Sequence, residues 1–339
     1  MLKIGDITVD SGCILAPMAG ISDLPFRMIN RSFGCEFAFA EMISARSLVY
    51  RSEKTMAMLS STPADKPLGV QLLGDDPGVL QRAMDKLREH NFALIDLNAA
   101  CPVKKVTGKG EGAGLLKEPR KLGKLLEVMV NHADVPVTVK IRAGWDETTI
   151  NAGDVARAAE DAGVKGLFIH GRTRAQGYRG KVDYEIISSV KKSLRIPVIA
   201  SGDALSPQLI KRMFDETGCD GVTIARGSLG NPWIFREAAA FLKEGALSRR
   251  PGIDEIADTM TRHLLSCAGA YGETVGTILF RKFFAWYTRG IPEIKPLKEK
   301  AFRAKTEAEM RETIEELCVG RQIHEMKKHD AFSIPTPPS

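Results

Sequence analysis

Eight short apolar runs, each followed by an amphipathic segment, fill the sequence up to about residue 240 and constrain its fold more than any other feature. Short apolar runs bounded by turn-forming residues are typical of buried strands. Apolar residues recur every three or four positions in segments 78–90 and 120–132, which predicts helices. Asp76 and Ser206, each followed by proline, are predicted N-caps. The expected strands are residues 13–17, 37–41, 68–72, 94–98, 137–141, 166–170, 198–201 and 221–225.

Regular alternation of strand and helix predicts parallel strands, in an open sheet or a closed barrel. An open sheet that binds a dinucleotide carries Gly-x-Gly-x-x-Gly after its first strand, whereas this turn reads Ala16-Pro-Met-Ala-Gly-Ile. Eight units therefore favour an α/β fold, a (β/α)8 TIM barrel followed by a small C-terminal all-helical domain. We expect a catalytic barrel over residues 1–245, a helical domain over 252–326 and a disordered tail over 327–339.

Composition excludes several classes of protein. No apolar run approaches the ~18 residues of a membrane span, and the N-terminus has no secretory signal pattern, so we expect a cytoplasmic protein. The six cysteines show no CxxC and no spacing with histidine that suits a metal site. The net charge is +6. Residues 281–328 contain 12 Lys and Arg against 8 Asp and Glu, a surplus of 4 that suits an anionic partner. Nothing in the sequence demands more than a monomer.

Polar side chains stand at the predicted strand ends. The active sites of TIM barrels lie at this end of the strands. Any one of these residues could have a purely structural role, such as a hydrogen-bonded histidine in the core or a lysine that points to solvent. Their number at one rim favours a functional site. They are Met18, Glu41, Gln71, Asn98, Lys140, Arg142, His170, Arg172, Ser201, Gly202, Asp203, Ala225 and Arg226.

The last two strands are followed by Ser201-Gly-Asp203 and Ala225-Arg-Gly227. Loops at these positions of a barrel often bind phosphate through backbone N–H groups, and Arg226 adds a cation. A phosphate-bearing cofactor is the natural inference, and FMN suits the site. Lys140 is expected at the anionic edge of the reduced flavin, and Gln71 at its pyrimidine edge.

Cys101 follows the fourth strand in a loop rich in glycine and lysine, 98–117. Such a loop could be merely flexible and solvated, with an incidental thiol. Beside a flavin, however, the reduction of a polarised C=C bond needs a hydride and, from a positioned acid, a proton. A thiol with a pKa near ~8.5 can donate that proton. The other cysteines fall in apolar or helical patterns and are expected to be inert.

Five motifs resemble the tRNA dihydrouridine synthases, bacterial B-type in particular. They begin at Ala16 (APMAGISDLPFR), Leu97 (LNAACPVKKVTG), Val139 (VKIRAG), Ile169 (IHGRTR) and Ala225 (ARG). The resemblance covers roughly residues 2–326, and the motif around Cys101 is its most specific part.

The resemblance implies FMN as cofactor, NADPH as reductant, and a flipped-out uridine of tRNA as substrate. Cys101 would protonate C5 of uracil while hydride reaches C6. Asn98 would orient the base, and Trp286 and Tyr287 would help the helical domain to grip tRNA. The implied flavin contacts are Pro17, Met18, Ala19, Gln71, Lys140, His170, Ser201, Gly202, Asp203, Ala225 and Arg226. The implied substrate contacts are Asn98, Lys104, Lys105, Arg142, Arg172, Arg174, Tyr178, Arg281 and Lys282.

The chain departs from the family pattern at a few positions. Ser201 replaces the usual asparagine, Ala99-Ala100 an often-found Met-Gly, and Ala225 the usual glycine. None of these changes removes a group that performs chemistry, and we interpret them as tuning flavin affinity.

Two alternatives remain open. A flavin-dependent reductase or dehydrogenase of a free pyrimidine would share the barrel, the FMN and the cysteine, but has no need of the lysine-rich loop or a basic helical domain. A non-catalytic tRNA-binding chaperone would not need Cys101. Deletion of the residues after about 250 would spare a free-base enzyme and abolish tRNA binding.

Overall fold

The computed structural model of the protein describes residues 1–247 and 249–330. Eight parallel strands close into a barrel in the order β10-β3-β4-β5-β6-β7-β8-β9, which confirms the predicted TIM barrel. The first and last strands meet through the pairing of Cys13 with Val222. The strands are β3 (Cys13–Leu15), β4 (Phe37–Ser44), β5 (Leu68–Leu73), β6 (Leu94–Asn98), β7 (Val137–Arg142), β8 (Leu167–His170), β9 (Val198–Ser201) and β10 (Gly221–Ile224).

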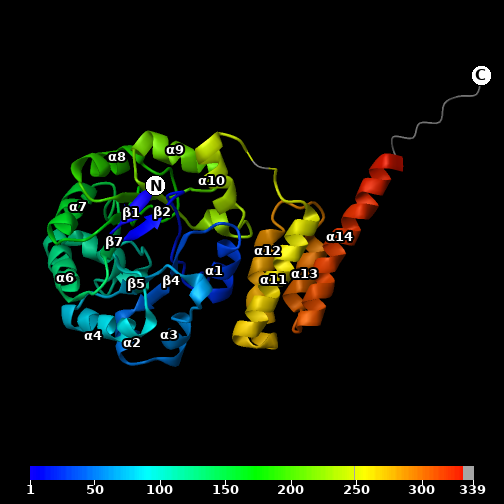
Figure 1. Cartoon of the computed structure of the whole chain (residues 1–339), viewed down its shortest axis with the longest axis horizontal. Coiled ribbons are helices and arrows are strands. Elements are labelled where there is room, and N and C mark those ends of the chain that lie inside the picture. Colours follow the sequence, from blue (N-terminus) through cyan, green and yellow to red (C-terminus); the bar gives the residue numbers. More distant parts are fainter. Residues whose placement is uncertain (248, 331–339) are drawn as a thin grey trace, which may run out of the picture. The chain divides into compact units, whose positions relative to one another are not determined.

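Helices surround the strands, as Figure 1 shows. Asp76 and Ser206 cap their helices by accepting hydrogen bonds from the N–H groups of Val79 and Leu209, as predicted. The α-helices are α1 (Leu24–Arg31), α2 (Ala45–Val49), α3 (Glu53–Met58), α4 (Pro77–Leu87), α5 (Lys104–Thr107), α6 (Pro119–His132), α7 (Ala152–Asp161), α8 (Tyr184–Ser193), α9 (Pro207–Thr217) and α10 (Ile234–Glu244). Short 3-10 helices are η1 (Pro63–Asp65), η2 (Arg88–His90), η3 (Gly112–Lys117) and η4 (Arg226–Ser228).

A hairpin that the sequence did not predict, β1 (Leu2–Ile4) and β2 (Ile7–Val9), packs against the barrel core. Its buried side chains Leu2, Ile4 and Val9 join a cluster with Phe37, Phe39 and Phe168, among others. Several of these partners, including Phe37 and Leu94, open their strands. The hairpin therefore covers the N-terminal end of the barrel and leaves the opposite end for function.

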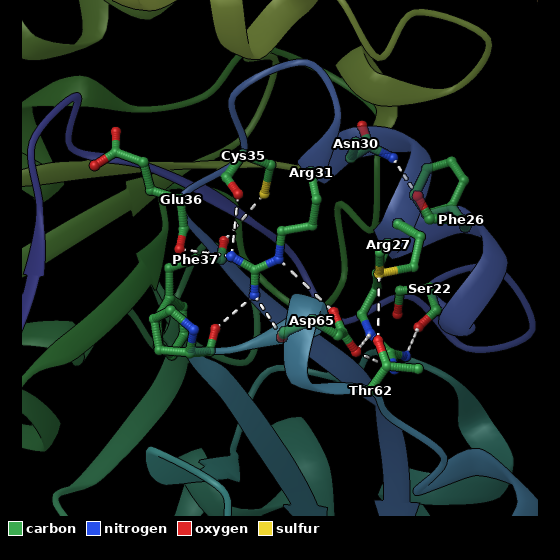
Figure 2. Close-up of polar contacts among 12 residues, drawn as sticks. Ser22, Phe26, Arg27, Asn30, Arg31, Cys35, Glu36, Phe37, Thr62 and Asp65 are labelled. Atoms are coloured by element: carbon green, nitrogen blue, oxygen red, sulfur yellow. Dashed lines mark hydrogen bonds and ion pairs between the residues drawn. The ribbon is translucent and has the colours of Figure 1, made fainter. Parts of the chain in front are cut away.

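A buried ion pair anchors α1 and the loop before it (Figure 2). Arg27 donates through Nε and Nη2 to Oδ2 of Asp65 at 2.9 and 2.7 Å. It also donates to the carbonyl of Ser22 at 2.7 Å. Arg31, one turn later, donates to the carbonyls of Cys35 and Glu36 and lies beside the same carboxylate. Arg27, the last residue of the first family motif, therefore positions the β3–α1 loop.

By their contacts, the described residues form two compact units. The second contains α11 (Ile253–Tyr271), α12 (Glu273–Tyr287), α13 (Lys295–Arg303) and α14 (Glu307–Asp330). It also includes Leu229–Asn231, which the sequence placed within the barrel. A Cβ on Gly230 would lie 2.2 Å from the carbonyl carbon of Trp286, so only glycine fits there. Of the predicted tail, residues 327–330 continue α14, and 331–339 lie outside the described residues.

None of the helices in the described parts of the chain combines the length and apolar character needed to span a bilayer.

Candidate active site at the barrel mouth

The β3–α1 loop carries three predicted flavin contacts, Pro17, Met18 and Ala19, at the C-terminal end of β3. The N–H of Met18 donates to Oγ of Ser22 at 2.9 Å, and the N–H of Gly20 donates to the Glu41 carboxylate at the middle of β4. Together with the anchor at Arg27, these bonds hold the loop from three sides.

A chain of hydrogen-bonded, buried polar side chains runs beneath the mouth from β5 to β7. Gln71 donates through Nε2 to Oδ2 of Asp96 at 2.7 Å, while Thr138 donates to Oδ1 at 2.7 Å. Asn98 donates through Nδ2 to Oε1 of Gln71 at 2.7 Å. Sequence reasoning missed Asp96 and Thr138. The signal for Asp96 was present, because a carboxylate inside an apolar strand pattern must find partners.

Asn98 also fixes the backbone of the cysteine loop. Its Oδ1 accepts the N–H groups of Ala100 at 3.0 Å and Cys101 at 2.8 Å. The carbonyl of Cys101 in turn accepts from the N–H of Ala113 at 3.1 Å. A Cβ on Gly112 would come within 2.9 Å of that carbonyl oxygen, which explains a glycine there. Cys101 is half-buried at the end of β6, and Lys104 and Lys105 stand exposed on α5.

Lys140 is the partner of Asn98 in the pairing of β6 with β7. Its Nζ donates to Oγ of Ser201 on β9 at 2.9 Å. Burial lowers the pKa of Lys140 to about 8, and the carboxylate of Asp96 opposes that shift. Burial raises the pKa of Asp96 to about 6. Each group favours the charged form of the other, and Lys140 itself is half-buried at the mouth.

Arg142 connects two loops. It donates through Nε to the carbonyl of Ala100 at 2.7 Å and through Nη1 to the carbonyls of Thr173 and Gly177 at 3.0 and 2.9 Å. Burial lowers the pKa of Arg142 only to about 10, so it stays charged. The guanidinium therefore ties the cysteine loop to the β8–α8 loop. A contact of Arg142 with substrate stays a prediction.

Arg172 binds groups of the protein, and its contact with substrate stays a prediction. Its Nη1 and Nη2 donate to the two oxygens of Asp203 at 3.1 and 2.5 Å. The remaining donors face the carbonyls of Arg179 and Gly180 and, at 3.4 Å, Nε2 of His170. Four of its five N–H groups therefore have oxygen acceptors, the fifth faces a histidine nitrogen, and the residue is 3% exposed.

His170 is buried among cations. Burial, followed by Arg142, Lys140, Arg172 and Arg226, holds its pKa well below 6.5. The imidazole is therefore neutral at physiological pH.

The β9 and β10 loops, called the cradle below, each contain a glycine at which protein atoms leave no room for a side chain. Gly202 has φ 117, and a Cβ there would lie 2.7 Å from Val182. A Cβ on Gly227 would lie 2.1 Å from the carbonyl of Ala204. Arg226 donates to Asp203 at 2.6 Å with a partly exposed guanidinium, and Ala225 precedes it at the end of β10. With Arg172, two cations face one carboxylate and leave a local surplus of positive charge.

Arg174 and Tyr178 lie on the β8–α8 loop. Tyr178 is 62% exposed, and the guanidiniums of Arg142 and Arg226 lie 5.8 and 5.1 Å from the centroid of its ring. Arg174 lies 4.4 Å from the ring of Trp145, whose centroid is also 3.6 Å from Nζ of Lys117. Sequence reasoning missed Trp145, which connects the β7–α7 loop with the cysteine loop.

The predicted RNA contacts of the helical unit lie in different surroundings from one another. Arg281 donates through Nε and Nη2 to the carbonyl of Ala304, just past the end of α13, at 3.0 and 2.6 Å. Lys282 lies over the ring of Phe283. Tyr287 is 5% exposed and its hydroxyl faces Nδ1 of His263, so its predicted contact with RNA is wrong.

The cysteines differ in their surroundings. Burial raises the pKa of both Cys13 and Cys35 to about 12. Cys101 and Cys318 are half-buried, and the other four are buried. Within the described ranges, no group of three or more His, Cys, Asp or Glu is placed to hold a metal ion.

Comparison with known proteins gives one consistent result. The family model described as dihydrouridine synthase (Dus) matches residues 14–324. A probable tRNA-dihydrouridine synthase of Rickettsia conorii is 39% identical over 86% of this chain and 88% of its own. A tRNA-dihydrouridine synthase B of Pseudomonas aeruginosa is 38% identical over 86% and 88% of the two chains.

Among solved structures, a 6-hydroxypseudooxynicotine amine oxidase of Pseudomonas geniculata superposes with a TM-score of 0.57 at 15% identity, over 78% of this chain and 52% of that one. This likeness concerns the fold alone. The match of the family model over most of the sequence, and relatives at this level of identity, show that the chain belongs to the dihydrouridine synthase family.

Proposed function

We propose that the protein reduces specific uridines of tRNA to 5,6-dihydrouridine, with FMN as bound cofactor and NADPH as its reductant. The observation that carries the proposal is the place of Cys101. Asn98 fixes its backbone at the end of β6, beside the strand that carries Lys140. The names of the relatives, tRNA-dihydrouridine synthases, support the substrate.

The residues present fit FMN. The cradle at Gly202 and Gly227 has no room for side chains, and its surplus positive charge suits a phosphate. Lys140 offers a half-buried cation for a negatively charged ring, and Gln71 offers an N–H. The residues that would hold the cofactor are Pro17, Met18, Ala19, Gln71, Lys140, His170, Ser201, Gly202, Asp203, Ala225 and Arg226. When bound and reduced, the flavin supplies the hydride that reaches C6 of uracil.

The chain itself contributes a proton and the positioning. The thiol of Cys101 donates a proton to C5 of the uracil, and Asn98 holds the cysteine loop and orients the base. The base must leave its stack, at a cost of a few kcal/mol, roughly. Lys104, Lys105, Arg174 and Tyr178 at the rim, with the helical unit, would contact the RNA. We place this activity in the cytoplasm, with the enzyme as a monomer.

Replacement of Cys101 tests the proposal. Cys101→Ala should retain bound flavin, seen as yellow colour, and form no dihydrouridine when NADPH and unmodified tRNA are added. Cys318→Ala, which also removes a half-buried thiol, is the matched control and should keep full activity. Mass spectrometry of the tRNA measures the product.

Two outcomes would overturn the proposal. A wild-type protein whose reduced flavin is reoxidised by free uracil but not by tRNA would be a free-pyrimidine reductase. Full product formation by Cys101→Ala would end the role of the thiol as proton donor.

A further inference from the structure

Asp96 lies outside the residues assigned to catalysis or binding, yet it is 1% exposed beneath the mouth and both of its oxygens accept hydrogen bonds. A buried carboxylate in the middle of a strand is costly even when it is hydrogen-bonded, which suggests that it has a structural or functional role. Its neighbours show what that role is.

The carboxylate determines how the amide of Gln71 is turned. An ionised carboxylate can only accept, so Gln71 must present Nε2 to Asp96. Oε1 of Gln71 then faces Asn98, which must answer with Nδ2. That choice leaves Oδ1 of Asn98 to accept the N–H groups of Ala100 and Cys101.

The other end of this hydrogen-bond chain, at Cys101, requires the same orientation of the amides. Backbone N–H groups can only donate, so the loop at Cys101 independently requires Oδ1 of Asn98 on its side. Every link from Asp96 to Cys101 therefore points in the same direction, and networks of this kind are cooperative.

We propose that Asp96 is a positioning residue, which orients the amides of Gln71 and Asn98 and thereby holds the backbone of Cys101 in place. The inference rests on the proposed function only in giving Cys101 a catalytic task. It also leaves the second N–H of Gln71 to donate to a ligand, because only one N–H is used on Asp96. A ligand carbonyl, as on the pyrimidine edge of a flavin, is the complementary group.

Moving the negative charge along the chain provides the test. In Asn98→Asp, a second carboxylate faces Gln71, whose oxygen must then point at one of the two anions. Adding Asp96→Asn restores a single charge and lets the chain reverse: Asn at 96 donates to Gln71, which donates to Asp at 98. The carboxylate at 98 still accepts the two backbone N–H groups. Asp96→Asn alone can keep the wild-type direction, because its amide oxygen faces Gln71 and its NH₂ faces Thr138.

The readout is hydrogen exchange of the Ala100 and Cys101 amides in the full-length protein, with flavin content measured in parallel. Turnover is not used, because Asn98 is assigned a contact with the base. We expect Asn98→Asp to exchange about tenfold faster or more, as for a lost buried hydrogen bond. Asp96→Asn and the double variant should stay within about threefold of wild type.

A double variant that exchanges as fast as Asn98→Asp would overturn the inference. If Asn98→Asp does not fold, the yield of folded protein is measured instead. Recovery of that yield by adding Asp96→Asn supports the proposed role of Asp96, and no recovery contradicts it. Either result stands apart from the proposed function, since neither requires dihydrouridine to be formed.

Discussion

His263 shows how burial of one residue makes stability depend on pH. Its ring lies in the core of the helical unit, 4.3 Å from the centroid of Phe283, with Nδ1 at 3.2 Å from the hydroxyl of Tyr287. Burial, assisted by Lys282, lowers the pKa of His263 from 6.5 to about 3. The folded state therefore keeps the imidazole neutral, while the unfolded chain takes up a proton below pH 6.5.

We expect the stability contributed by His263 to be complete above pH 6.5 and to fall as pH decreases toward about 3. The slope is up to ~1.4 kcal/mol per pH unit for one proton. Urea unfolding at several pH values, followed in peptides of α11 and α12 by pulsed hydrogen exchange, measures it. His263→Phe should flatten the slope, whereas His90→Gln, which changes a half-buried histidine of the barrel, should not. An equal acid-induced loss in His263→Phe would contradict the assignment.

At the residue scale, the sequence predicted which side chains stand at the strand ends better than which partners they take there. Arg172 and Arg142 both stand at the strand ends as expected, but the first donates to Asp203 and to two backbone carbonyls and the second joins two loops. A guanidinium has five donors, and their partners depend on carbonyls distant in the sequence. Spacing along the chain does not record those partners. For Asp96 the sequence signals a need for partners, but not that these lie on two other strands.

At the element scale, the loop after β9 depends on a glycine for two separate reasons. Gly202 has φ 117, which side chains rarely adopt, and a Cβ there would also lie 2.9 Å from the ring of His170. Gly218, the C-cap of α9, has φ 66 with no atom within 4 Å of its ideal Cβ. Replacing Gly218 therefore introduces backbone strain alone, whereas replacing Gly202 introduces both backbone strain and a steric clash.

Gly218→Ala should cost ~1 kcal/mol of folding stability and leave flavin binding unchanged. Gly202→Ala should cost more, displace His170 and lose most of the bound flavin, because the cradle no longer fits a phosphate. Urea midpoints and the ratio of flavin to protein absorbance report the two effects. Equal flavin content in both variants would show that the β9 loop does not hold the cofactor.

Elements with a strong periodic pattern were predictable, and short ones were not. All eight strands and the N-caps at Asp76 and Ser206 were predicted from the sequence. Strands that are buried on both faces appear as short apolar runs, and N-caps are marked by their residue type. The hairpin of β1 and β2 has strands of three residues each. Strands that short are stable only through packing, here against Phe37, Phe39 and Phe168. That packing exists only once the barrel has closed.

At the scale of the whole molecule, the number of strand–helix repeats predicted that the barrel closes. Which residues belong to the barrel and which to the helical unit could be seen only in the structure. Leu229–Asn231 belong to the helical unit although they precede α10 of the barrel. A deletion of the residues after about 250 would therefore leave Gly230 without the backbone of Trp286 on which it packs. Point variants on the helical unit test its role more cleanly than truncation does.

Helix α13 offers such variants. Lys295 and Arg303 are exposed, Lys298 is half-buried, and none of the three forms an ion pair among the described residues. Lys300 on the same helix instead lies 3.3 Å from Glu312 and 2.5 Å from Glu316. If the helical unit binds tRNA, the first three cations can neutralise phosphates, whereas Lys300 is already neutralised by the protein.

The triple replacement Lys295→Ala, Lys298→Ala and Arg303→Ala should weaken tRNA binding and reduce the slope of log Kd against log salt by about 2 to 3. Lys300→Ala removes the same type of charge from the same helix and should change the slope by less than about 1. Fluorescence anisotropy of labelled tRNA over about 50 to 200 mM salt measures both. Neither variant should alter flavin content, because the proposed cofactor contacts all belong to the barrel. An unchanged slope in the triple variant would show that α13 is not part of the RNA interface, because the slope counts the phosphates that Lys and Arg side chains neutralise.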